Sequence, residues 1–159
     1  MIIAVGSDHR GFNTKTHLIG LLNELGHQGI DCGTDSAESA DYPDFAAKVA
    51  QMVSQGQAHR GILICGTGIG MAITANKFAG IRACTCHDEM TARLSRQHND
   101  TNVLCLSADL LGERVMNRLV EIWLATEFEK GRHARRVEKI AQYESQAMHS
   151  APGNTSGCP

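Results

Sequence analysis

The chain has 159 residues and a formal net charge of −2, and aromatic side chains make up only 4% of it. This length suits one domain with a single hydrophobic core. The near-neutral charge argues against a nucleic-acid or membrane-surface binder, and the few aromatic residues provide no stacking platform for bases.

The apolar start of the chain is too short for a signal peptide, and no apolar run reaches the length of a membrane span. Six cysteines without a secretion signal indicate free thiols in a reducing compartment. We therefore expect a cytoplasmic protein that binds neither nucleic acid nor membranes.

Short apolar runs alternate along the chain with segments of helical periodicity. The expected strands are residues 2–6, 28–32, 62–64, 81–86 and 103–106. The expected helices are 12–25, 44–55, 71–77, 87–97, 110–128 and 132–146, and 33–43 is expected to be a polar loop. Strands that alternate with helices predict a parallel sheet covered on both faces.

We therefore expect an α/β fold, a single-domain Rossmann-like three-layer sandwich with a five-stranded parallel sheet of order 2-1-3-4-5. The domain is expected to span residues 1–148. The small and polar residues from 149 to 159 are typical of a disordered tail.

The stretch 61–70, Gly-Ile-Leu-Ile-Cys-Gly-Thr-Gly-Ile-Gly, joins the third strand to its helix through a glycine-rich turn. Such a turn exposes backbone N–H groups that can bind anions, and a helix N-terminus favours a thiolate. Cys65, where the strand should end, is therefore a candidate reactive thiolate. A tight turn with a buried structural cysteine explains the same pattern equally well.

Familiar nucleotide- and phosphate-binding motifs do not fit this turn. The dinucleotide fingerprint requires a glycine where the chain has Met71, and the P-loop requires a closing Gly-Lys-Ser/Thr. A cysteine phosphatase needs an arginine soon after the cysteine, whereas the next arginine is Arg82. Cys84, Cys86 and His87 have the wrong spacing for a zinc knuckle, so no metal site is expected.

A second polar loop, Ser7-Asp8-His9-Arg10-Gly11, follows the first expected strand. The first and third strands are neighbours at the switch point of such a sheet, where ligands bind beyond the carboxyl ends of the strands. The two chemically richest loops should therefore meet at one edge, which favours a functional site.

With both loops identified, four motifs together resemble those of a known family. They are Gly6-Ser7-Asp8-His9-x-Gly11, Asp41-Tyr42-Pro43, the stretch 61–70 with Asn76-Lys77, and Ser95-Arg96-Gln97-His98-Asn99-Asp100. Over about residues 2–145 the chain resembles the sugar-phosphate isomerases, the family that includes ribose-5-phosphate isomerase B and the galactose-6-phosphate isomerase subunits. The resemblance implies a homodimer without metal or cofactor that interconverts ribose 5-phosphate and ribulose 5-phosphate through an enediolate.

The resemblance also implies roles for single residues. Cys65 matches the catalytic base, and Met71 at the place of a glutamate in serine-bearing relatives puts the chain on the thiol branch. His98 matches the acid/base that opens the furanose ring. The oxyanion would be held by the Thr67 hydroxyl and by N–H groups of the turn, from Gly66, Gly68, Ile69 and Gly70. The sugar and its phosphate would be bound by Asp8, His9, Tyr42, Asn99, Arg132 and Arg136.

Each of these residues also has a structural explanation. His98 could be a helix-terminal histidine favoured by the helix dipole, and Asp8 and His9 a strand-end polar turn. Tyr42 could be a packed loop residue, and the arginines a solvated helix face. The expected fold adds one constraint, because helices run back from the catalytic edge and His98 should lie at the opposite edge from Cys65. We therefore expect an obligate homodimer with shared active sites, with dimer against tetramer left open.

One residue departs from the pattern, because Asp109 occupies the place after the fifth strand where many relatives have arginine. A carboxylate there would repel a phosphate. Either Asp109 turns away and Arg10 or Arg114 substitutes, or the substrate differs. The alternatives are an isomerase of a six-carbon sugar phosphate such as allose or galactose 6-phosphate, a non-catalytic module that binds a phosphorylated ligand, and a thiol-dependent phosphatase.

Overall fold

The computed structural model describes residues 1–150, with side chains described to residue 147. Five parallel strands form one sheet: β1 (Ile2–Ser7), β2 (Gln28–Asp31), β3 (Arg60–Cys65), β4 (Ala83–Thr85) and β5 (Val103–Ser107). The helices are α1 (Phe12–Glu24), α2 (Tyr42–Ser54), α3 (Ile69–Ala75), α4 (Glu89–Asn99), α5 (Glu113–Ala125) and α6 (Arg132–Ser150), with a 3-10 turn, His9–Gly11, before α1.

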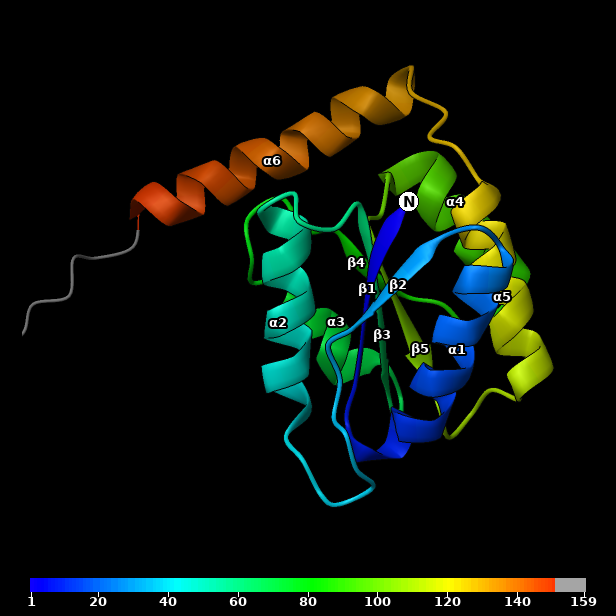
Figure 1. Cartoon of the computed structure of the whole chain (residues 1–159). Helices are drawn as coiled ribbons and strands as arrows, with labels where there is room; N and C mark the ends of the chain where they lie inside the picture. Colours follow the sequence, from blue (N-terminus) through cyan, green and yellow to red (C-terminus); the bar gives the residue numbers. More distant parts are fainter. Residues whose placement is uncertain (151–159) are drawn as a thin grey trace, which may run out of the picture.

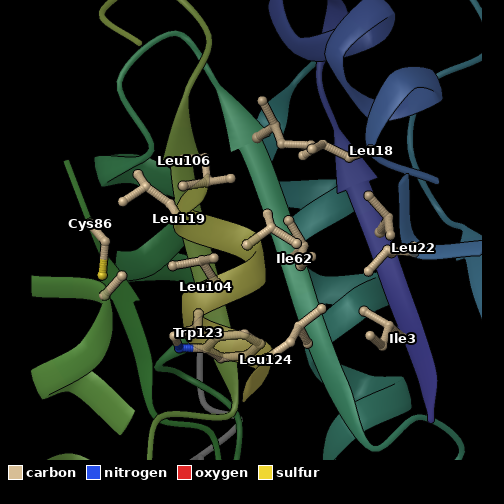
Figure 2. Packing of buried hydrophobic residues seen from close by; sticks show 14 of the residues in the cluster. Ile3, Leu18, Leu22, Ile62, Cys86, Leu104, Leu106, Leu119, Trp123 and Leu124 are labelled. Carbon is tan, nitrogen blue, oxygen red and sulfur yellow. The ribbon is translucent and has the colours of Figure 1, made fainter. Parts of the chain in front are cut away.

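Helices cover both faces of the sheet, which confirms the expected three-layer α/β fold (Figure 1). Alternate residues of a strand face opposite layers. In β3, Ile62 and Ile64 pack with the layer of α1, α4 and α5, whereas Leu63 and Cys65 pack with α2 and α3. Figure 2 shows the first cluster, in which Ile62 meets side chains such as Leu104 and Trp123. Because both faces are covered, β3 is an apolar run rather than an alternating one.

The strand order is β2-β1-β3-β5-β4, so the expected order 2-1-3-4-5 is wrong at its last two places. Five residues of β5, all buried, pair with β3, whereas the three residues of β4 are only partly buried. The fully buried β5 is paired on both sides and lies inside the sheet. The short, partly buried β4 is paired on one side only and forms the edge strand.

The handedness of the crossovers agrees with this order. Right-handed connections place the helix on one face when the chain steps one way across the sheet, and on the other face when it steps back. The step from β4 back to β5 reverses direction, and α4 accordingly packs with α1 and α5 rather than with α2 and α3. Its Ala92 is buried in the cluster that contains Leu104 and Leu119.

The expected elements are all present, with shifted bounds. The fifth helix, expected over 110–128, is shorter, because Asp109 and Leu110 lie in a turn after β5 and Gly112 precedes the first helical residue. Tyr42, expected in a loop, is the first residue of α2. The expected tail began at residue 149, but residues 149 and 150 belong to α6, and residues 151–159 lie outside the described residues. Within residues 1–150, no helix is both long enough and apolar enough to cross a membrane.

Candidate active site

The turn after β3 places Cys65 at the carboxyl edge of the sheet. Gly68 adopts a left-handed conformation with φ of +77°, and a Cβ there would lie 3.1 Å from the backbone of Leu106, so the position requires glycine. The Gly68 N–H donates to the Cys65 sulfur at 3.1 Å, and only 5% of Cys65 is exposed. The turn therefore holds the thiol in one orientation at the end of the strand.

Thr67 and Tyr42 complete this turn. The Thr67 hydroxyl accepts the N–H of Ile69 at 3.3 Å, so Gly68 and Ile69 each already have an intramolecular acceptor. A Cβ on Gly70 would lie 2.6 Å from the Tyr42 ring, which shows that this ring packs directly on the turn. Tyr42, which the sequence suggested as a pocket residue, therefore lies beside the glycines of this turn.

The loop after β1 lies against the same turn, as the switch-point argument predicts. Asp8 is buried, and its Oδ1 accepts the backbone N–H groups of Arg10 at 2.9 Å and Gly11 at 3.4 Å. A Cβ on Gly11 would lie 2.7 Å from the Ile64 side chain, so the loop packs tightly on β3. The next residue, His9, accepts a backbone N–H through Nδ1 at 3.2 Å. The loop with Asp8 and His9 and the Cys65 turn with Tyr42 thus lie at the same ends of the neighbouring strands β1 and β3.

A second cluster gathers around His98, the penultimate residue of α4. Its ring stacks on His133 of α6, with centroids 4.1 Å apart and an angle of 2° between the planes. One carboxylate oxygen of Glu129 lies 3.9 Å from His98 Nε2 and 3.7 Å from His133 Nε2. The Nε atom of Arg132 lies 3.3 Å from His133 Nε2, and Arg136 follows one turn later on α6.

Burial and neighbouring charges shift the pKa of His133. Burial lowers the pKa of His133, and the nearby His98, Arg132 and Arg136 lower it further, whereas Glu129 raises it. These surroundings therefore favour the uncharged form of the His133 imidazole. Sequence reasoning missed this residue, although it lies next to Arg132 in the run Arg-His-Ala-Arg-Arg.

The ligand atoms of His98, Glu129 and His133 lie within 4.8 Å of one another, as in a metal site. A histidine nitrogen holds a metal along its lone pair, in the plane of its ring. Two parallel rings stacked 4.1 Å apart have no such point in common. Together with the neighbouring arginines, this geometry favours proton transfer and anion binding rather than a cation.

Within one chain, the two clusters lie at opposite ends of the parallel strands, one beyond the carboxyl ends and the other at the amino ends. In the β3–β5 register, Gly61 pairs with Val103 and Cys65 with Ser107. His98 precedes β5 at the Gly61 end, so about 13 Å of strand separates it from the level of Cys65. Figure 1 shows α6 at the end where β1 begins, and the site residues His98, Asn99, Arg132 and Arg136 belong to that edge.

Comparison with known proteins places the chain in a family. It matches the Ribose/Galactose Isomerase family over residues 3–140. It is 49% identical to ribose-5-phosphate isomerase B of Escherichia coli (strain K12), over 89% of this chain and 95% of that protein. It is 40% identical to D-erythrulose-4-phosphate isomerase of Pectobacterium atrosepticum, over 92% of this chain and 97% of that protein.

A solved structure gives the same result. The structure of Clostridium thermocellum ribose-5-phosphate isomerase B superposes with a TM-score of 0.91 at 48% identity, over 92% of this chain and 99% of that one. Both sequence and fold are therefore similar over nearly the whole chain. The chain belongs to the ribose/galactose isomerase family.

Proposed function

We propose that the protein is a ribose-5-phosphate isomerase that interconverts ribose 5-phosphate and ribulose 5-phosphate. Family membership supports a sugar-phosphate isomerase, and the name of the Escherichia coli relative supports the pentose. The observation that carries the proposal is a thiol held by a glycine turn at one edge, with paired histidines and arginines at the other. Isomerisation of a cyclic sugar phosphate needs both sets of groups.

In the proposed reaction, the Cys65 thiolate removes the proton from C2 of the open-chain aldose. The electron pair moves into an enediolate between C1 and C2, and the thiol then returns a proton to C1. A second proton passes from the O2 hydroxyl to O1, which leaves the ketone at C2. The Thr67 hydroxyl and the N–H groups of the turn other than those of Gly68 and Ile69, which already have acceptors, stabilise the developing oxyanion, and no cofactor is required.

His98 opens the furanose ring before this step. It delivers a proton to the ring oxygen and, as the conjugate base, takes up the proton of the O1 hydroxyl, which releases the aldehyde and restores His98. His98 is partly exposed, stacks on His133 and lies 3.9 Å from a carboxylate oxygen of Glu129. Arg132 and Arg136 hold the phosphate, because guanidinium groups match its oxygens.

The two clusters can act on one sugar only if they come from two subunits, so we propose an obligate homodimer with shared sites. Exposed apolar side chains on α6 support this assembly, since Ile140 and Tyr143 are 47% and 68% exposed. Ile140 also lines a largely apolar groove of about 470 Å³ beside the β4 edge, with Ala83 and Leu94. A second copy would cover these side chains.

The first test is conversion of ribose 5-phosphate to ribulose 5-phosphate by the purified protein, with and without a chelator. We expect conversion that chelation leaves unchanged and that Cys65→Ala abolishes. Cys84→Ala is the matched control, because Cys84 is a free thiol outside the turn. This variant should convert ribose 5-phosphate as the wild-type protein does. Absence of conversion by folded wild-type protein would reject the pentose, and four- and six-carbon sugar phosphates would then be assayed.

The thiols also bear on the compartment. All five cysteines of the described residues are free, which supports a reducing compartment such as the cytoplasm.

A further inference from the structure

An arginine and an aspartate that are 99 residues apart in the chain meet at the Cys65 turn. Arg10 Nε lies 3.1 Å from Asp109 Oδ1, and Arg10 Nη2 lies 2.7 Å from Asp109 Oδ2. Arg10 belongs to the loop after β1, and Asp109 to the turn after β5. Two parallel hydrogen bonds fix the plane of the guanidinium as well as its position.

This pair lies directly on the residue that follows the proposed base. The Asp109 N–H donates to the Gly66 carbonyl at 3.2 Å, and the Ala108 N–H donates to the Cys65 carbonyl at 2.9 Å. A Cβ on Gly66 would lie 2.8 Å from Asp109 Oδ2 and 3.6 Å from Arg10 Nε. The backbone of the Cys65 turn therefore positions Asp109, and Asp109 in turn positions Arg10.

A contribution to folding stability does not explain why Arg10 and Asp109 are paired. The Arg10 and Asp109 side chains are 54% and 38% exposed, and exposed ion pairs contribute little to folding. A guanidinium has five N–H donors, and Asp109 engages Nε and Nη2 only. The Nη1 donors have no hydrogen-bond partner among the described residues, so the oriented cation keeps free donors for an anion.

We propose that Arg10 binds the substrate phosphate on the Cys65 side of the site, and that Asp109 is a positioning residue that holds the guanidinium for it. The inference rests on the proposed function, because the phosphate is the only dianionic group of that substrate. In this proposal Asp109 acts through Arg10. The guanidinium of Arg10 already neutralises the Asp109 carboxylate before the phosphate binds. Arg114 instead lines a groove with Glu89 and Arg118.

The test compares Arg10→Ala, Arg10→Lys and Asp109→Asn with Arg114→Ala, an exposed arginine outside the pair. The readouts are KM and kcat for ribose 5-phosphate and the inhibition constant of inorganic phosphate. We expect Arg10→Ala to raise KM and the phosphate inhibition constant about tenfold, with a smaller change in kcat. Arg10→Lys should recover part of this loss as a point charge, and Arg114→Ala should change neither constant.

Asp109→Asn separates positioning from simple charge. A positioning role predicts a higher KM, because the arginine loses its fixed orientation although the net charge becomes more favourable for an anion. In the Arg10→Ala background, the same change should not raise KM, since there is no longer a guanidinium to position. A lower KM for Asp109→Asn alone would show that Asp109 merely repels the substrate, and would overturn this role.

Binding to the Cys65→Ala protein, measured by calorimetry with ribose 5-phosphate and with inorganic phosphate, gives a readout that does not require turnover. Affinities unchanged within twofold by Arg10→Ala would show a surface ion pair only. An inactive wild-type protein would instead reject the proposed function, whereas weaker phosphate binding in the Arg10→Ala variant would still support the anion site.

Discussion

Subunit complementation tests the proposed sharing of active sites between subunits most directly. The perturbation is a mixture of two inactive variants, Cys65→Ala and His98→Ala, that have exchanged subunits. A proton transfer requires heavy atoms about 2.6–3.2 Å apart. The β3–β5 register puts about 13 Å of strand between the levels of these residues in one chain. One sugar cannot place its reacting atoms against both residues of the same subunit.

The expected recovery follows from the symmetry of a dimer. Random exchange makes half of the dimers mixed, and each mixed dimer has one site with both residues intact and one site with neither. The mixture should therefore recover about one quarter of the wild-type activity at equal subunit concentration. The assay is conversion of ribose 5-phosphate, with exchange confirmed by native mass spectrometry of differently tagged chains.

Two results would refute this reasoning. Complete inactivity of the mixture, with mixed dimers demonstrated, would mean that both residues act from one chain or that one of them is not catalytic. Full activity of either variant alone would remove that residue from the mechanism. A mixture of Cys65→Ala with Cys65→Ala carrying the second tag is the matched control and should stay inactive after exchange.

Three further predictions concern the turn, the histidine pair and the thiols. Gly68→Ala should lower the unfolding free energy by about 1–2 kcal/mol in urea titrations and impair catalysis, because φ of Gly68 is +77°. The control Gly20→Ala, inside α1, should raise the unfolding free energy by about 0.5–1 kcal/mol. The free energy of unfolding should fall as the pH drops from 7 to 5, because the lowered pKa of His133 lets the unfolded chain bind more protons than the folded one in this range. His133→Asn should flatten this pH dependence, and an unchanged slope in that variant would refute the prediction. The hydrogen bond from Cys86 lowers the pKa of the Cys84 thiol, so iodoacetamide at pH 8 should label Cys84 before Cys86 in peptide mass spectra, and the reverse order would contradict this.

The sequence was sufficient for the features that depend on short-range geometry. The Cys65 turn could be predicted because a strand, alternate glycines and a helix start lie within ten residues, and the conformation of Gly68 is a local steric matter. The parallel sheet followed from alternating strands and helices. The separation of His98 from Cys65 followed as well, because a helix between parallel strands must run back across the sheet.

Other features depend on which distant segments pack together, and the sequence alone did not determine them. The exchange of β4 and β5 depends on which strand is covered on both edges, and periodicity within a strand does not report that. The stack of His133 on His98 and the pairing of Arg10 with Asp109 join elements that meet only through this sheet order. Local sterics and hydrogen bonds act over a few residues, whereas these contacts arise from the packing of the whole domain, so only the tertiary structure decided them.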